Sequence, residues 1–137
     1  MDKNLISIGF NAKGKEEAIR EAGRLLKDNG YCNENYVDSM VETEKKLGPY
    51  IVITKNIAMP HARPEDGAKK SGFSIVRLKE PIEFGNKEND PVKVVIGLCA
   101  FTNEEHVNTM SQIAEMMLNP EKTEIIFNGD IEEFSKL

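Results

Sequence analysis

The run VKVVIGLCA at residues 92–100 is the stretch of sequence that decides the fold. Every residue in it except Lys93 is apolar or glycine. A strand with one solvated face alternates between apolar and polar residues, whereas a strand that is covered on both faces is apolar almost throughout. The sequence therefore predicts a strand in a sheet that has other layers of the chain on both of its faces.

Three other short segments have the composition of strands. Leu5–Phe10 alternates in the manner of an edge strand, and Tyr50–Thr54 is rich in β-branched residues. Phe73–Leu78 is the third of these segments. Pro81–Pro91, which precedes the run at 92–100, is rich in Gly, Asn, Asp and Pro and predicts a connection built from turns.

Two helices are expected in the first third of the chain. Apolar residues recur at helical spacing over Lys15–Asn29, and Gly30 stands where such a helix would stop. Asn33 is placed to cap a second helix that ends near Leu47. The apolar residues of this second helix predict one buried face: Tyr36, Val37, Met40 and Val41.

Further helices are expected after the run at 92–100. Thr102-Asn103-Glu104-Glu105 has the form of a capping box and predicts a helix start. The apolar residues of this helix predict one buried face: Val107, Met110, Ala114 and Met117. Glu121–Leu137 predicts one or two more helical segments, broken at Asn128-Gly129. Together these elements predict an α/β protein: one domain over residues 1–137, with a mixed sheet flanked by helices on both faces.

Length and charge limit the functions that the chain can have. A chain of 137 residues suits one domain with one core. Its 18 Lys and Arg residues against 23 Asp and Glu residues give a formal net charge of −5. Nucleic-acid binding is not expected, because it needs a concentrated basic face. Lys45-Lys46, Asp38 and Glu42 are expected to lie on solvated surface.

The sequence predicts a cytoplasmic protein. It contains no apolar run of 18 residues, and its N-terminal apolar segment is too short for a signal peptide, so neither membrane insertion nor export is expected. Cys32 and Cys99 are far apart in sequence and form no CxxC pair. A disulfide is therefore not expected.

His61 is the first of two histidines and lies within Pro60-His61-Ala62-Arg63-Pro64. The two prolines restrict the backbone on each side of His-Ala-Arg, so the imidazole is expected to be held in place. Three roles are open to it. It could be a structural histidine bonded to a carbonyl, a metal ligand, or a nucleophile in its neutral form. A metal site is disfavoured because no second ligand stands at a short spacing such as HxH or HExxH.

His106 is the second histidine and falls in the first turn of the helix expected after Thr102. If the strand ends before His61 and His106 converge on one rim of the sheet, His106 could donate an N–H to a phosphoryl group on His61. Alternatively, His106 is only exposed on that first turn.

Arg63 could bind a phosphate or a carboxylate of a partner, or it could pair on the surface with Glu65 or Asp66.

Several separated motifs resemble one protein family. They are GPYIVI at 48–53, NIAMPHARPE at 56–65, PIEFG at 81–85 and NDPV at 89–92, followed by His106 at a helix start. This order resembles the enzyme IIA components of the mannitol/fructose type in the bacterial phosphoenolpyruvate-dependent sugar phosphotransferase system. PHARPE together with the FG and NDPV segments is most similar to the ascorbate-type branch.

The resemblance covers roughly Glu16 to Leu118 and implies a phosphotransferase that needs no cofactor. His61 would take a phosphoryl group from phospho-HPr and pass it to a cysteine of a IIB component, which serves a membrane IIC transporter. His106 would assist by hydrogen bonding. Two other functions remain open: a regulatory module of the same fold, switched by phosphorylation of His61, and a non-catalytic binding domain.

Two positions depart from the mannitol-type pattern. An arginine and a glutamate of that pattern are replaced by Thr43 and Lys55, which leaves Arg63 as the nearest candidate to balance the charge of a phosphate. A relay between proteins also needs apolar surface around the nucleophile. Residues beside His61 are expected to supply this apolar rim: Ile57, Met59 and Ala62.

Overall fold

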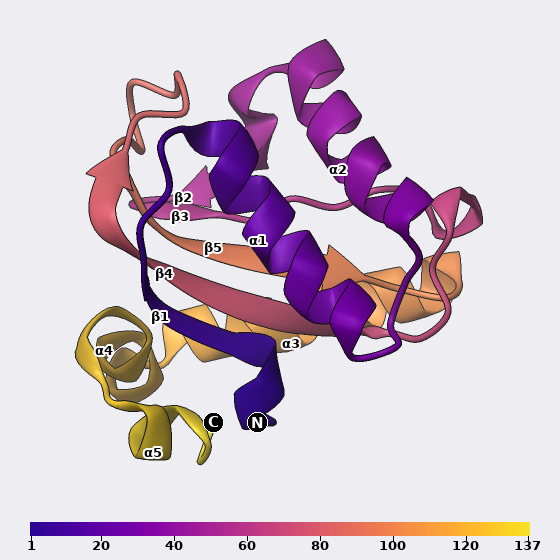
Figure 1. Cartoon of the computed structure of the whole chain (residues 1–137). Coiled ribbons are helices and arrows are strands. Elements are labelled where there is room, and N and C mark those ends of the chain that lie inside the picture. The colour runs from indigo at the N-terminus through magenta and orange to yellow at the C-terminus, as the bar shows by residue number, and fades with distance from the viewer.

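The computed structural model describes residues 1–137 and shows a five-stranded mixed sheet between two layers of helices (Figure 1). The strand order is β1-β4-β5-β3-β2. β1 is parallel to β4, and β3 is parallel to β5, whereas the β4–β5 and β2–β3 pairs are antiparallel. The strands are β1 (Ile6–Phe10), β2 (Val52–Thr54), β3 (Ile57–Ala58), β4 (Gly72–Ile82) and β5 (Val92–Cys99).

α2 and α3 begin at the caps that the sequence predicts. Asn33 caps α2, since its side chain accepts a hydrogen bond from the Tyr36 N–H at 3.0 Å. Thr102 caps α3 in the same way, and Asp130 caps α5. None of the helices has the length and apolar character that crossing a membrane requires. The helices are α1 (Lys15–Asp28), α2 (Glu34–Leu47), α3 (Asn103–Leu118), α4 (Pro120–Asn128) and α5 (Ile131–Phe134).

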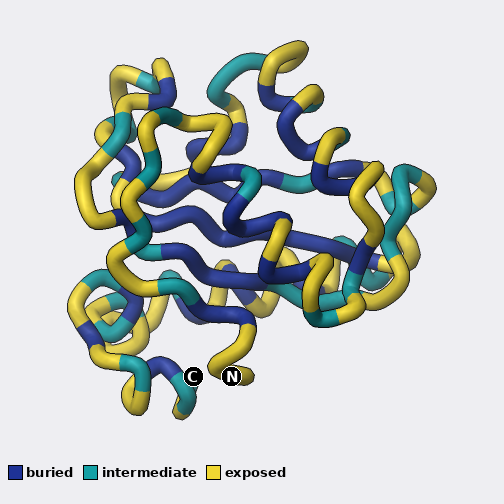
Figure 2. The backbone as a smooth tube through the Cα atoms, viewed as in Figure 1, coloured by how far each residue is buried: buried dark blue, intermediate teal, exposed yellow.

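β5 is buried on both faces, which confirms the prediction from its apolar sequence. Val95 and Cys99 pack in one cluster with α1 and α2. Ile96 and Leu98 pack in a second cluster with α3, α4 and α5. The strands consequently form the buried centre of the molecule, and the exposed residues lie on the helices and loops around them (Figure 2).

The hairpin of β2 and β3 was only partly predicted. Pro49–Ile51 forms a 3-10 turn, so the strand expected from Tyr50 begins at Val52. The chain then reverses at Asn56, whose φ of 69° is left-handed, and forms the two-residue strand β3. β4 also runs beyond Leu78 to Ile82, because β5 continues the pairing up to Ile82.

The buried face predicted for α3 was wrong. The residues that it buries are Thr109, Ile113 and Met116. Val107, Met110 and Ala114 are exposed, and Met117 is half-buried. The reason is that α3 contacts the sheet through only a narrow row of residues. The apolar residues next to this row therefore remain exposed.

Tyr36 links three parts of the fold through one buried hydroxyl group. The Tyr36 O–H donates to the carbonyl of Leu98 at 2.7 Å, near the end of β5. Its oxygen accepts the N–H of Ala62 at 3.1 Å, in the loop after β3. Burial raises the pKa of Tyr36, so the phenol stays neutral. α2, β5 and the loop that carries His61 are thereby fixed to one another.

Replacing Tyr36 with phenylalanine tests this link. We expect Tyr36→Phe to lower the free energy of unfolding by about 1–3 kcal/mol, because the buried N–H of Ala62 loses its acceptor. Urea unfolding measures the change. Tyr50→Phe is the matched control, since Tyr50 is 81% exposed and should leave stability unchanged. Equal stabilities of the two variants would contradict the structural role of the hydroxyl.

Candidate functional site

His61 and His106 meet at one rim of the sheet. β3 and β5 are parallel neighbours, with Ala58 opposite Val95, so their carboxyl ends lie on the same side. His61 follows β3, and His106 follows β5 in the first turn of α3. Their ring centroids are 5.4 Å apart, with the planes at 68°. The convergence that the sequence left open is therefore present, at the kind of edge where ligand sites of α/β proteins gather.

The His61 ring is held by a backbone hydrogen bond. Its Nδ1 lies 3.0 Å from the carbonyl oxygen of Met59. A carbonyl oxygen can only accept, so the proton of the neutral ring is on Nδ1 and the lone pair is on Nε2. The carbonyl of Pro60 accepts the N–H of Leu98 at 3.0 Å, which fixes this loop to β5. His61 therefore offers one free nitrogen from a fixed ring.

His106 is half-buried at the N-terminus of α3. Its backbone N–H donates to the Thr102 carbonyl at 2.9 Å. Burial lowers the pKa of His106, and the neighbouring His61 lowers it further. The positive end of the helix dipole at this position also disfavours a charged imidazole. His106 is therefore set up as a neutral ring with an N–H to donate.

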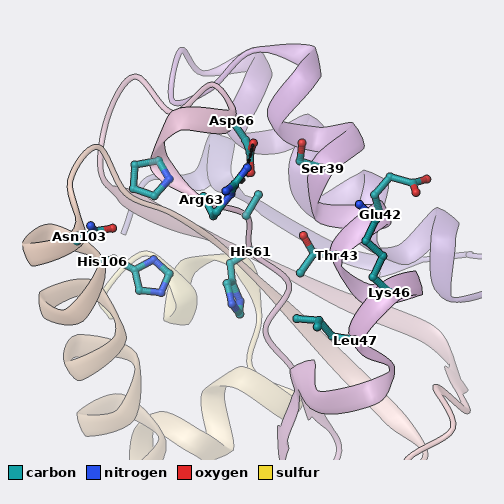
Figure 3. Close-up of a pocket in the computed structure, with 12 residues that line it drawn as sticks. Ser39, Glu42, Thr43, Lys46, Leu47, His61, Arg63, Asp66, Asn103 and His106 are labelled. Atoms are coloured by element: carbon teal, nitrogen blue, oxygen red, sulfur yellow. Dashed lines mark hydrogen bonds and ion pairs between the residues drawn. The ribbon is translucent and has the colours of Figure 1, made fainter.

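The two histidines line an open cleft of about 660 Å³ between α2 and α3 (Figure 3). The wall opposite α3 comes from one face of α2, of which only Thr43 was connected with the site from the sequence. Its residues are Ser39, Glu42, Thr43, Lys46 and Leu47. They recur three or four positions apart, so their helical spacing was a signal that they share a face. Glu42 and Lys46 are exposed, as expected, but their surface is the wall of this cleft.

Thr43 and Lys55, the two departures noted in the sequence, lie in different places. Thr43 lines the cleft on the same wall as Leu47. Lys55 lies in the turn between β2 and β3 and does not line the cleft. Its ammonium group donates instead to the Glu88 carbonyl at 3.3 Å. Only Thr43 is therefore placed to affect chemistry at His61.

Arg63 lines the cleft, but its charge is directed toward its own turn. Its Nη2 lies 3.4 Å from Oδ1 of Asp66, and its Nε lies 3.9 Å from Oε1 of Glu65. The side chain is 75% exposed and lies beside Asp66 in the close-up (Figure 3). The surface pairing considered for Arg63 from the sequence is thus what the structure contains. The structure contains no group of three or more His, Cys, Asp or Glu residues that could hold a metal ion.

The apolar rim predicted around His61 was wrong. Ile57, Met59 and Ala62 are all buried, with exposed fractions between 2% and 4%. Ile57 and Met59 pack under the sheet with α3, and Ala62 packs with α2. A segment next to a reactive residue can be part of the core, and local sequence does not show which side it faces.

Other apolar residues are exposed near the cleft. Leu47 and Tyr50, at the end of α2 and just after it, are 60% and 81% exposed. Phe101 precedes α3 and is 57% exposed, while Val107, next to His106, is 61% exposed. Met110, one turn after His106, is 37% exposed. We call these five residues the exposed apolar border.

The whole chain, residues 1–137, matches the family described as phosphoenolpyruvate-dependent sugar phosphotransferase system, EIIA 2. The chain belongs to this enzyme IIA family, as its motifs indicated. Membership makes it a phosphotransfer component of a sugar phosphotransferase system.

Named relatives include components for different sugars. The chain is 37% identical over 105 residues to the ascorbate-specific EIIA component of Salmonella choleraesuis, covering 77% of this chain and 68% of the relative. It is 35% identical over 129 residues to the mannitol-specific cryptic enzyme IIA component of Escherichia coli, covering 93% and 86%. The solved complex of mannitol enzyme IIA with phosphorylated enzyme IIB from Escherichia coli matches with a TM-score of 0.85, at 30% identity over 99% of this chain and 94% of that chain.

The coupling between the two histidines can be measured. Replacing His61 with alanine should raise the pKa of His106 toward its ordinary value without reaching it, because burial, the larger cause, remains. NMR titration of the His106 ring in both proteins gives the two values. A pKa that is unchanged or lower in His61→Ala would contradict the coupling.

The same shift sets the sign of a pH effect on stability. Because folding lowers the pKa of His106, the unfolded chain binds more protons at mildly acidic pH. The contribution of His106 to stability is therefore fully present above about pH 6.5, the ordinary value of histidine, and is lost as the pH falls toward the lower folded-state pKa.

Proposed function

We propose that His61 is the phosphorylated residue of a cytoplasmic phosphoryl carrier. It accepts the group from phospho-HPr and passes it to a cysteine of a IIB component, which drives uptake of ascorbate or a related sugar through a membrane IIC transporter. The observation that carries this proposal is the bond from Nδ1 of His61 to the Met59 carbonyl. It orients the ring and leaves Nε2 as the nucleophile in a residue that lines the cleft.

The transfer of the phosphoryl group from phospho-HPr to His61 requires no proton transfer. The lone pair on Nε2 of His61 forms the new N–P bond as the N–P bond of the donor phosphohistidine breaks. The ring of His61 keeps its Nδ1 proton on the Met59 carbonyl, and the donor ring leaves as a neutral imidazole that keeps its own proton. In the second transfer, a cysteine thiolate of the IIB component forms an S–P bond as the bond to Nε2 breaks.

His106 and the start of α3 assist by stabilising the transferred group. Phosphoryl transfer has a loose transition state, so a protein contributes chiefly by positioning and by balancing charge on the oxygens. A neutral His106 next to His61 supplies an N–H, and the helix N-terminus adds a favourable dipole. We assign Arg63 to contact with the phosphate or with a partner, once it leaves Asp66.

The exposed apolar border is proposed as the docking surface for the partner proteins. It lies on both sides of the cleft, at the end of α2 and along the first turns of α3. A partner bound there would cover His61 and exclude water during transfer. The solved complex of mannitol enzyme IIA with phosphorylated enzyme IIB supports a IIB component as one such partner.

The sugar is proposed from the relatives' names, which include ascorbate-specific and mannitol-specific components. The ascorbate type is favoured because PHARPE and the FG and NDPV segments are most similar to that branch. The carrier itself need not contact the sugar, so this assignment depends on the membrane component with which the chain works.

Labelling with radioactive phosphoenolpyruvate, enzyme I and HPr tests the carrier. The wild-type chain should gain an acid-labile phosphate, and His61→Ala should gain none, since the accepting nitrogen is gone. A wild-type chain that stays unlabelled while a control enzyme IIA protein labels would exclude the relay. Rapid loss of the label to an added IIB component would distinguish a carrier from a regulatory switch.

His106→Ala is the informative companion variant. We expect it to label about tenfold more slowly, because it retains the nucleophile but lacks one donor to the phosphoryl oxygens. Labelling kinetics equal to those of the wild type would remove His106 from the site.

A further inference from the structure

One cation in the cleft has no carboxylate partner. Among the cleft residues, the permanent positive charges belong to Arg63 and Lys46. Arg63 is engaged by Asp66 and Glu65. Lys46 is exposed and forms no ion pair within 4.0 Å, although Glu42 lies one turn away on α2. Its charge is therefore available to a ligand.

The wall formed by α2 is unfavourable to an anion without such a cation. Glu42 adds a carboxylate to this wall, 3.8 Å from the Lys45 ammonium, and the negative end of the α2 dipole lies near Lys46 and Leu47. A phosphoryl group on His61 would bring about 1.5 to 2 further negative charges. His106 and the start of α3 line the cleft opposite α2, so a positive charge on α2 would balance such a group from the other side (Figure 3).

We propose that the ε-ammonium of Lys46 binds the phosphoryl group on Nε2 of His61 and stabilises its dianion. Lys46 stands on the α2 wall, next to Thr43 and across the cleft from His106. A lysine suits this task because its flexible stem can follow the group as it arrives and leaves. This inference rests on the proposed phosphorylation of His61.

Lys45 provides a matched control one residue away. It has the same charge but is paired with Glu16 at 3.2 Å and does not line the cleft. We expect Lys46→Gln to slow labelling from phospho-HPr about tenfold, a modest factor because the cleft is open to water. Lys45→Gln should label as the wild type does, and Lys46→Arg should stay within about threefold of it. The deficit of Lys46→Gln should shrink at high salt.

The ³¹P resonance of the isolated phosphorylated chain distinguishes phosphate binding from partner docking. A nearby cation favours the dianion, so the phosphoryl group should titrate at higher pH in Lys46→Gln than in the wild type and Lys45→Gln. Equal titrations in all three proteins would overturn the inference, even if Lys46→Gln weakened partner binding. If the wild-type chain does not label at all, the proposed function fails; if it labels and Lys46→Gln labels equally well, only this inference fails.

Discussion

The hydroxyl group of Tyr36 is the constraint on which the rest of the site depends. It is buried, and it bonds both Leu98 at the end of β5 and Ala62 next to His61. A buried phenol that lost these partners would be costly, so α2 and the loop after β3 hold their positions together. The same link sets the spacing between the α2 wall and the histidines, because α2 carries both Tyr36 and the residues that line the cleft.

The sheet topology determines which side chains meet at the site. Parallel pairing of β3 and β5 brings the two histidines to one rim, and the cap of α3 places His106 at a helix start. The Met59 carbonyl holds Nδ1 of His61 and leaves Nε2 as the nitrogen that we propose reacts. The cleft is open, which suits the proposed carrier role, because His61 would have to reach one protein and then another. Stabilisation of the proposed phosphoryl group therefore depends more on a few well-positioned hydrogen-bond donors and cations than on burial.

Most of the fold was predictable because its signals are local. The caps at Asn33 and Thr102 and the apolar sequence of β5 were interpreted correctly. The errors concern features that tertiary pairing decides. β3 is two residues long and exists because β5 pairs with it, and the burial of Met59 follows from that pairing. The α2 wall was not predicted for the same reason. The sequence of a polar helix face is the same whether that face borders bulk solvent or lines a cleft.

The protonation of the His61 ring is the property that tests the proposed carrier most directly. Long-range ¹H–¹⁵N NMR spectra of the neutral ring distinguish its two nitrogens, and phosphorylation then shows which one bonds to phosphorus. We predict a proton on Nδ1, held by the Met59 carbonyl, and the phosphoryl group on Nε2. A proton on Nε2 in the free protein, or phosphate on Nδ1, would contradict this prediction.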